Sequence, residues 1–463
     1  MKRLTARNDR RLIALFAILG GIRVALLSAG LPFWNNVDEK AHADMVMRYA
    51  QFRIPDRMER YSPESASLIV ACDCNEYILP REMALKYHPP ASAYKEIYNL
   101  NSLQPPAYYA LAGAWYRASR AFGLSGCPAM ASVRALNGLL FAILIGVCGA
   151  LARRFYPGER VIGLGTPILL MALPQDLFYS INADVPSALL CASALLFLPT
   201  GRAASNRWAF AGLLASLALL TKYSNLGILA SGLAVGWWAW RDGRNRKMLS
   251  RGFIFAGIAV ALPVLAWLAH NAFILGDPLG MRGKIAWLGW TPRPWSTLLD
   301  HPLFTMQGAA YFFGELARRG WRGELVWHGM PMANGLSDGW YTWSTAVFLV
   351  VAFIGVIRSA ADKRMADSIN FAFLLASIAF LVWTSLSWDF GNCPYPSRNL
   401  PYLVSARLIS GGLTPFVMLY LRGFDRLCPP RWGFGVRISL VGILAFAMFV
   451  SDLIIRWPAL FLK

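Results

Sequence analysis

The stretch LPFWNNVDEKAHADMVMRYAQFRIPD, residues 31–56, follows the first hydrophobic segment of the chain. It places Asp38 and Glu39 side by side where that segment ends, with His42 one helical turn further on. The surrounding chain is strongly apolar, because 56% of its 463 residues are hydrophobic, only 15% are charged, and the mean hydropathy is +0.43. We therefore expect a polytopic membrane protein in which two neighbouring acids lie at a helix end.

Apolar runs recur along the whole chain and predict an all-α architecture, because helices rather than an open sheet satisfy their own backbone groups in lipid. We expect about 11 to 13 transmembrane helices and a single integral-membrane domain over residues 1–463. The runs lie near residues 12–31, 105–122, 133–152, 161–173, 184–198, 209–240, 252–272, 343–357, 369–388, 406–422 and 436–456.

Basic residues predict which helix ends face the cytoplasm. The N-terminal MKRLTARNDRR precedes a first run without a small-residue cleavage site, so we expect a retained helix with a cytoplasmic start. Residues 241–251 hold five Lys and Arg against one acid, and 426–437 are also basic, whereas 32–104 hold eight basic residues against ten acids and 273–342 are nearly balanced. The last two ranges are the predicted extracytoplasmic loops, with short amphipathic helices at the membrane surface.

This charge pattern explains the net charge of +20 as a topology signal with attraction to anionic membrane lipids, and we find no nucleic-acid module. The expected location is the bacterial inner (plasma) membrane. If every apolar run crossed once, residues 241–251 would lie outside. One segment between residues 105 and 200 must therefore be re-entrant or broken, and the proline-containing stretches 165–176 and 104–117 are the candidates.

Asp38 and Glu39 are the first candidates for chemistry. Acids at a helix start are also favoured by the helix dipole, so a solvated loop is the alternative explanation. A functional pair at the membrane surface would supply a general base or ligands for a divalent metal ion, which is the only cofactor that the residues suggest.

Other polar residues interrupt the apolar runs. QPPAYY puts Gln104 and Tyr108 at a helix entry, although proline in a first turn is structurally ordinary. NAD places Asp184 between two apolar runs, where capping is the structural alternative. Lys222 in LLTKYSN is flanked by apolar segments, and an ionisable residue in such a place is a candidate for function.

Basic residues also lie near the predicted outer ends of later helices. WLAHNAFILGDPLGMRGK contains His270 and Arg282, with Lys284 at its end, and WDFGNCPYPSRNLPYLVSARLI contains Arg398 and Arg407. Arginine near a membrane surface often contacts lipid headgroups. The functional alternative is a clamp on a substrate phosphate, since a guanidinium binds two oxygens at once.

The order of these motifs resembles the GT-C superfamily of membrane glycosyltransferases, in its protein O-mannosyltransferase and lipid A aminoarabinose transferase type. The resemblance covers residues 1–290, the expected catalytic module, and leaves 291–463 as variable C-terminal helices. It implies a catalytic acid at Asp38 with Glu39 beside it, the Pro-Pro entry after Gln104, and a second acid at Asp184. Relatives often carry Lys before the prolines, so here the cation must come from elsewhere, such as Lys86 or Lys95.

Such enzymes transfer a sugar from a polyprenyl-phosphate carrier to a glycan, lipid or protein acceptor on the outer face of the membrane. The expected reaction is an inverting displacement with Asp38 as base. Glu39 would assist Asp38 by hydrogen bonding or by holding the metal, and Arg398, Arg282 or Lys222 would hold the leaving phosphate. The remaining predicted substrate contacts are His42, Gln104, Tyr108 and His270.

Two further interpretations stay open. A transporter or flippase of lipid-linked sugars would explain Lys222 and broken helices, but it predicts inverted repeats, which we do not find in the sequence. Among the seven irregularly spaced cysteines, Cys72, Cys74 and Cys393 fall in predicted outer regions. A disulfide from Cys393 to Cys72 or Cys74 and a metal pair at CDC are both open there, and the sequence does not decide between these and free thiols.

Overall fold

The computed structural model describes residues 2–34, 38–72, 79–84, 86, 89–198, 205–241, 246–391, 393 and 395–461. Its α-helices are α1 (Lys2–Gly30), α2 (Glu39–Ala50), α3 (Pro63–Ala71), α4 (Arg81–Ala84), α5 (Ala91–Lys95), α6 (Ala107–Ala121), α7 (Gly126–Phe155), α8 (Arg160–Ala172), α9 (Val185–Phe197), α10 (Ser205–Thr221), α11 (Gly227–Arg241), α12 (Arg246–Leu275), α13 (Arg282–Leu288), α14 (Met306–Arg322), α15 (Gly335–Arg358), α16 (Ala361–Ser387), α17 (Leu413–Leu427) and α18 (Phe434–Phe461).

Short 3₁₀ helices and strands connect these helices. The 3₁₀ helices are η1 (Asp176–Tyr179), η2 (Tyr223–Leu226), η3 (Trp295–Thr297), η4 (Pro302–Phe304) and η5 (Ala406–Gly412). The strands are β1 (Thr291–Pro292), β2 (Val326–Trp327), β3 (Met330–Pro331) and β4 (Trp388–Asp389), paired antiparallel as β1 with β4 and β2 with β3. The predicted all-α membrane architecture is therefore confirmed.

Six described helices, α1, α7, α12, α15, α16 and α18, are long and apolar enough to cross a membrane. The most apolar part of α7 is 61% buried, whereas that of α12 is only 6% buried. Apolar residues thus face the protein interior on α7 and the surroundings on α12, as expected for a central helix and for one that contacts lipid. The predicted total of 11 to 13 crossing helices stays a prediction.

Two shorter apolar helices, α8 and α9, have 13 residues each and rise about 20 Å, which is less than the roughly 30 Å of a bilayer core. Between them, residues 173–184 run through the interior and are buried throughout. Pro174 follows the end of α8 and Pro186 lies in the first turn of α9, so prolines bound the interruption. A broken segment of the predicted kind therefore lies here.

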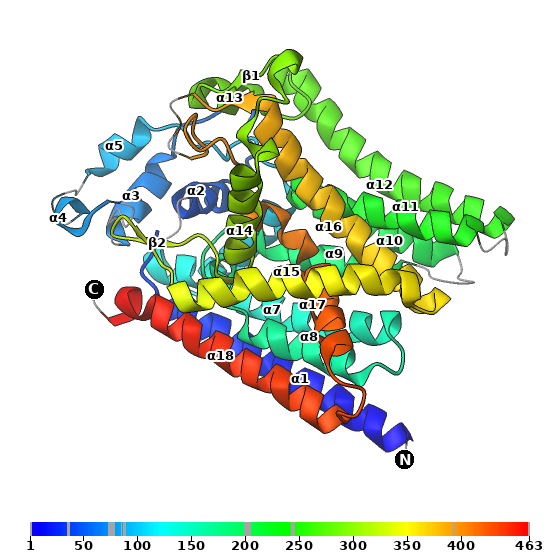
Figure 1. The fold of residues 1–463 in the computed structure, drawn as a ribbon. Helices are drawn as coiled ribbons and strands as arrows, with labels where there is room; N and C mark the ends of the chain where they lie inside the picture. The colour runs from blue at the N-terminus through cyan, green and yellow to red at the C-terminus, as the bar shows by residue number, and fades with distance from the viewer. Residues whose placement is uncertain are drawn as a thin grey trace.

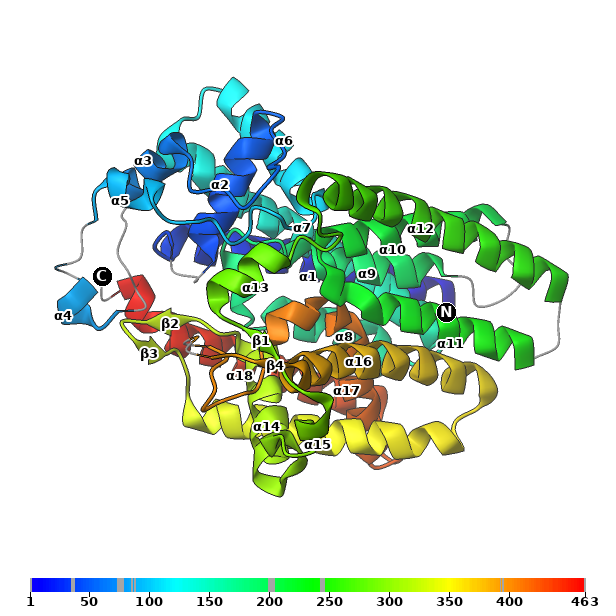
Figure 2. The ribbon, with the colours of Figure 1, turned by 90° about the horizontal axis from the view of Figure 1, so that it is seen from above.

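The two ends of the helices carry different parts of the chain (Figures 1 and 2). Figure 1 shows α2, α3 and α5 at one end, with α13 and β1 along the same side of the molecule. The N-terminus, the end of α11 and the start of α12 lie at the opposite end. The two predicted outer loops are thus separated from the basic N-terminal segment by the length of the helices.

A buried ion pair connects the first and last long helices. Arg23 on α1 donates to Asp452 on α18 at 2.8 Å and to the carbonyl oxygens of Met171 and Leu173, each at 2.6 Å. Because these partners satisfy a buried guanidinium, they fix the end of α8 against α1 and α18. The interruption between α8 and α9 is therefore held at a defined place.

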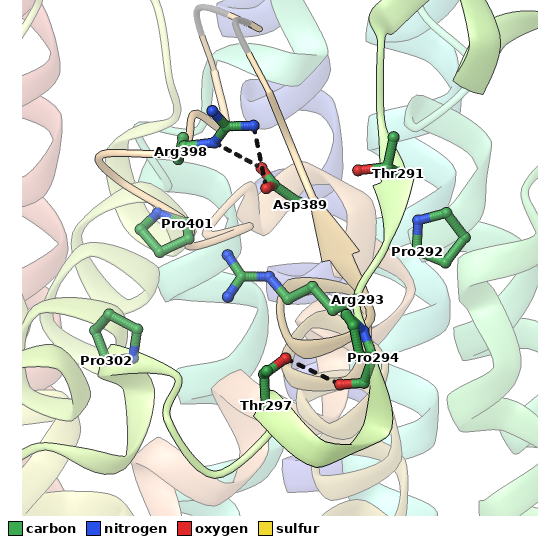
Figure 3. A pocket seen from close by; sticks show the side chains of 9 residues that line it. All are labelled: Thr291, Pro292, Arg293, Pro294, Thr297, Pro302, Asp389, Arg398 and Pro401. Carbon is green, nitrogen blue, oxygen red and sulfur yellow. Dashed lines mark hydrogen bonds and ion pairs between the residues drawn. The ribbon is translucent and has the colours of Figure 1, made fainter.

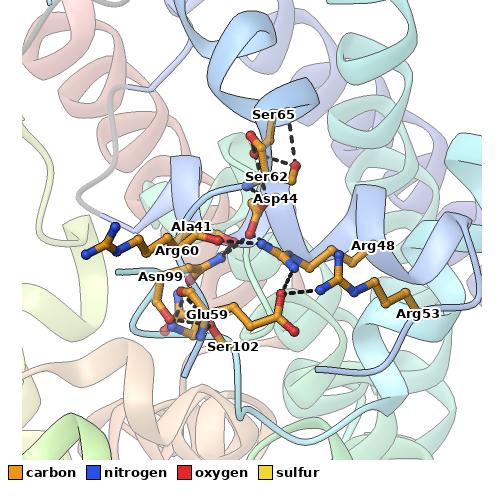
Figure 4. Close-up of polar contacts among 11 residues, drawn as sticks. Ala41, Asp44, Arg48, Arg53, Glu59, Arg60, Ser62, Ser65, Asn99 and Ser102 are labelled. Atoms are coloured by element: carbon orange, nitrogen blue, oxygen red, sulfur yellow. Dashed lines mark hydrogen bonds and ion pairs between the residues drawn. The ribbon is translucent and has the colours of Figure 1, made fainter. Parts of the chain in front are cut away.

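The first predicted outer loop is folded around Asp44 on α2 (Figure 4). Its carboxylate accepts hydrogen bonds from Arg48 Nε at 2.8 Å, Ser65 Oγ at 2.6 Å and Asn99 Nδ2 at 2.8 Å. Residues Glu39 to Arg48 of α2 are all buried. The amphipathic helix expected at the surface is therefore an interior helix, because α3 and α6 cover its polar side.

The disulfide that the structure contains is not one of those considered from the sequence. Cys72, at the end of α3, is bonded to Cys127 in the first turn of α7, and Cys393 is a free, buried thiol. Cys74, and with it the CDC metal pair, lies outside the described residues. The bond attaches the first loop to a membrane helix and so reinforces the position of α3.

Candidate active site

Asp38 occupies the residue before α2 and turns its carboxylate toward Arg407. Among the described residues, that carboxylate caps no backbone amide of α2. Arg407, in η5, forms an ion pair with Asp38 across 369 positions of sequence. Burial would raise the pKa of the Asp38 carboxyl, but the charges of Arg407 and Lys284 outweigh burial and hold that pKa well below its usual range.

A second ion pair lies beside the first. Lys222, at the break between α10 and η2, pairs with Asp184 Oδ1, and Asp184 is buried. The other oxygen of that carboxylate, Oδ2, is buried without a hydrogen-bond partner among the described residues. A polar hydrogen in a bound substrate would satisfy this oxygen.

Lys284 on α13 completes a cluster of three cations. Burial, with the charges of Lys222 and Arg407, lowers the pKa of its ammonium, while Asp38 and Asp184 act in the opposite direction. The pKa of Arg407 is raised despite its burial, because Asp38, Glu324 and Asp184 all favour the charged form. Three cations thus surround Asp38 and Asp184, and this set of five charges carries an excess of one positive charge.

Glu39 has a different environment from its neighbour. Its side chain is fully buried and bound by Arg134 of α7 through two hydrogen bonds, each 2.7 Å long. Its oxygens also accept the backbone amides of Trp34 and Ile181, each at 2.9 Å. Because these four bonds occupy both oxygens, the predicted metal pair of Asp38 and Glu39 does not fit this arrangement.

The metal prediction has no other support from the described residues. No three side chains of His, Cys, Asp or Glu among them lie close enough together to hold a metal ion. Of these two neighbouring acids, Asp38 turns its carboxylate toward the cation cluster, whereas Glu39 turns its carboxylate toward Arg134.

His42 lies one turn after Asp38 and is buried. Its Nδ1 is 2.7 Å from the hydroxyl of Tyr109, and its ring meets that of Tyr108 edge-on. Burial lowers the pKa of the imidazole to about 3, because the charge of Asp38, which raises this pKa, is outweighed by burial together with the charges of Lys222, Arg407 and Lys284. His42 is therefore neutral near pH 7 and contributes no charge to the cluster.

Gln104 and Tyr108 lie at the predicted helix entry, because α6 begins directly after the two prolines. Gln104 Nε2 donates to Asn101 Oδ1 at 3.1 Å, and Asn101 Nδ2 is 3.5 Å from His42 Nε2. Tyr108 is almost fully buried against Tyr109. Tyr108 therefore contacts the His42 ring directly, and Gln104 is connected to it through Asn101.

Three of the predicted substrate-binding residues are not among the described partners of the cluster around Asp38. Arg398 is paired with Asp389 at 3.2 Å and its side chain is 65% exposed. Arg282 is exposed and donates its backbone amide to Asp277 at 2.7 Å. His270 stacks on Trp267 near the end of α12. None of them is among the described partners of Asp38.

Sequence reasoning did not select Arg407 and Lys284 as site residues, although both lie in the quoted stretches. For Arg407 both lipid-headgroup contact and a phosphate clamp stayed open, because a sequence does not reveal which of several basic residues faces inward. The signal that identifies them is three-dimensional, because Arg407 at the start of η5 and Lys284 in the first turn of α13 both act on Asp38, directly before α2.

No protein-family model matches the chain, and no curated protein matches it in sequence. Its structure aligns with that of ArnT from Cupriavidus metallidurans bound to undecaprenyl phosphate, with a TM-score of 0.52 and 14% identity over 96% of this chain and 72% of ArnT. The fold is GT-C-like. Because this alignment covers nearly the whole chain, the GT-C-like fold extends past residue 290.

Weaker overlaps were found with two other solved structures. The archaeal oligosaccharyltransferase AglB from Archaeoglobus fulgidus aligns with a TM-score of 0.44 and 11% identity, over 95% of this chain and 55% of AglB. The arabinosyltransferase EmbB from Mycobacterium smegmatis aligns with a TM-score of 0.36 and 12% identity, over 92% of this chain and 37% of EmbB.

Proposed function

We propose that this protein is a glycosyltransferase that moves a sugar from a polyprenyl-phosphate carrier to an acceptor. The observation that carries the proposal is the ionised Asp38 surrounded by Arg407, Lys284 and the Lys222–Asp184 pair. A transfer from a lipid phosphate requires a carboxylate to take a proton and cations to hold the departing phosphate, and this cluster supplies both. ArnT, whose fold the chain shares, was solved with undecaprenyl phosphate bound.

An apolar cavity beside the cation cluster supports a lipid carrier. It measures about 430 Å³ and lies among α14, α15, α16, η5 and α17. Ala406 and Ile409, on either side of Arg407 in the sequence, both contribute to its wall. An isoprenoid chain in this cavity would place its phosphate near Arg407, because η5 borders both the cavity and the charged site.

The proposed reaction is a displacement with inversion. The acceptor loses its proton to Asp38, its heteroatom bonds to the anomeric carbon, and the bond from that carbon to the carrier oxygen breaks. The electron pair leaves with the phosphate, which Arg407 and Lys284 stabilise. A donor phosphate would also share the Arg407 guanidinium with Asp38, which raises the basicity of Asp38 when the donor is bound.

Glu39 would act as a positioning residue in this scheme, because its bonds to Arg134 fix the start of α2 directly beside Asp38. Asp184 would orient the acceptor or the sugar through Oδ2, the oxygen to which no described residue donates a hydrogen bond. Lys222 would keep Asp184 ionised and add to the positive field. His42, Gln104 and Tyr108 would shape the wall of the site.

We infer that the site opens on the extracytoplasmic side of a bacterial inner membrane, with the N-terminus in the cytoplasm. The Cys72–Cys127 disulfide supports this orientation, because such bonds persist in oxidising compartments. The acids of the site also lie at a helix end, where an enzyme acting at the membrane surface needs them. A transporter of lipid-linked sugars would instead place its charged site near the middle of the membrane.

Replacing Asp38 tests the proposed function. In the full chain, Asp38→Asn should lower sugar transfer from undecaprenyl-phosphate sugars by about 10²- to 10⁴-fold, because the general base is lost. Binding of undecaprenyl phosphate should persist, since the three cations remain. Asp56→Asn is the matched control, because Asp56 lies in the same loop with 70% of its side chain exposed. Near wild-type turnover by Asp38→Asn would contradict the assignment.

A further inference from the structure

A second cavity lies between the segment that follows α13 and the segment that connects α16 to η5 (Figure 3). It is about 430 Å³ in volume, within the range of sites that bind small molecules. Strand β1 follows α13, and strand β4 precedes η5, so the pairing of β1 with β4 forms its back wall. The cavity is lined by Thr291, Pro292, Arg293, Pro294, Thr297, Pro302, Asp389, Arg398 and Pro401.

Arg293 provides an anchored cation in this cavity. Its Nε donates to the carbonyl oxygen of Trp388 at 3.0 Å, and its backbone amide donates to Ser387 at 2.9 Å. Figure 3 shows its guanidinium extending between Pro401 and Asp389. No described residue accepts a hydrogen bond from its two terminal nitrogens, so both are available to a ligand.

The other charges of the cavity leave it positive. Arg398 and Asp389 bind each other through both carboxylate oxygens, at 3.2 Å each, and so largely neutralise each other. The Gly391 amide holds the same carboxylate at 2.9 Å. The charge of Arg293 therefore remains as the excess, and an anionic group is the ligand that it favours.

The remaining walls suit a ligand larger than a free anion. Thr291 and Thr297 add hydroxyl groups, and four prolines give rigid walls that lose little entropy when a ligand binds. A volume of about 430 Å³ far exceeds the space that one phosphate ion needs. Hydroxyls, rigid apolar surface and one free guanidinium together match a sugar ring with a phosphate or carboxylate substituent.

The cavity is connected to the candidate active site by short segments. Lys284 lies in α13 and Thr291 opens β1, so the cavity wall begins seven positions after a residue of the cation cluster. At about 1.5 Å per helical residue and 3.4 Å per extended residue, the two Cα atoms lie within roughly 16 Å. A single acceptor molecule of a few sugar units can therefore contact both places.

We propose that this cavity, between β1 and β4, binds an anionic saccharide and serves as the acceptor subsite. The inference rests on the proposed function, because it identifies the acceptor class for that reaction. Arg293 binds the phosphate or carboxylate, and the threonine hydroxyls and prolines hold the ring. The reacting group of the acceptor then extends toward Asp38.

Binding of defined sugars to the full chain in nanodiscs tests this inference without depending on turnover. By saturation-transfer NMR, glucose 6-phosphate and glucuronic acid should bind at least about tenfold more tightly than glucose, as expected for a charge-assisted bidentate contact. Arg293→Gln should abolish this preference, and Arg293→Lys should restore only part of it. Arg398→Gln gives a second variant, since it frees Asp389 to oppose the anion and should also weaken binding.

Arg57→Gln is the control, because Arg57 lies on the other outer loop with 82% of its side chain exposed. Glucose 6-phosphate and glucuronic acid distinguish a phosphate-bearing from a carboxylate-bearing acceptor. Equal binding of inorganic phosphate and glucose 6-phosphate would overturn the saccharide assignment, and unchanged binding by Arg293→Gln would overturn the site. Either failure leaves the Asp38→Asn result intact, so the two proposals are tested separately.

Discussion

At the scale of single residues, two neighbouring acids have different environments. Asp38 and Glu39 look equivalent in the sequence, yet Asp38 faces the cations Arg407 and Lys284, whereas Glu39 is enclosed by Arg134 and two backbone amides. The sequence indicated both acids as candidates, and only the resemblance to GT-C enzymes favoured Asp38 as the base, which stays a prediction. The sequence was insufficient to select Arg407, which lies 369 positions away and becomes a partner only through folding.

The pH dependence of Arg407 variants tests that partnership. The pKa of Asp38 is depressed in the folded protein, so the base stays ionised and wild-type activity is lost only at low pH. Arg407→Gln removes the largest opposing charge and leaves burial, which raises the pKa. The acidic limb of kcat/KM should therefore move to higher pH, in addition to a fall in rate.

Arg407→Lys distinguishes charge from geometry in the same measurement. Arg407→Lys should leave the acidic limb of kcat/KM at low pH, because the positive charge beside Asp38 is kept. The value of kcat/KM should still fall, because lysine cannot bind two oxygens of the donor phosphate at once as arginine does. Arg53→Gln, at a side chain that is 56% exposed, is the control for a general loss of positive charge. An acidic limb that does not move in Arg407→Gln would show that Asp38 is not the titrating base.

At the scale of elements, helical periodicity predicted most of the architecture. The apolar runs located the long helices, and the charge imbalance predicted a break between residues 105 and 200, where α8 and α9 are short. Two features could not be predicted. The burial of α2 depends on α3 and α6 packing over it, and the partner of Cys72 depends on α7 starting beside α3.

The attachment of α2 to α7 gives a stability prediction. Glu39→Gln leaves Arg134 buried with an incomplete partner, and breaking a buried pair typically costs about 3–5 kcal/mol. Thermal unfolding of the detergent-solubilised chain should show a clear fall in midpoint temperature. Glu64→Gln, where half the side chain is exposed, should change the free energy of unfolding by about 1 kcal/mol or less.

The same comparison checks the role of Glu39. If Glu39→Gln abolished transfer without lowering the unfolding temperature, Glu39 would be a catalytic residue and not a positioning residue. We expect Glu39→Gln to lower the transfer activity and the unfolding temperature together, because the four hydrogen bonds of Glu39 fix the start of α2.

At the scale of the whole molecule, charge and shape agree about orientation. The basic N-terminal segment, the end of α11 and the start of α12 share one end of the helix assembly, and α2, α3 and α5 lie at the other (Figure 1). The disulfide and the candidate active site both lie at the second end. One orientation in the membrane therefore satisfies the positive-inside rule and the redox requirement together.

Labelling of introduced cysteines tests this orientation. The background keeps the Cys72–Cys127 disulfide and replaces the other five cysteines by serine, so that each variant has one reactive thiol. Arg57→Cys and Leu299→Cys lie on the two outer loops at side chains that are 82% and 79% exposed, and both should react with an impermeant maleimide in intact cells. Asn245→Cys, within the basic stretch 241–251, should react only after the membrane is opened, because five basic residues resist transfer across it. Labelling of Asn245→Cys in intact cells would reverse the orientation and place Asp38 on the cytoplasmic side.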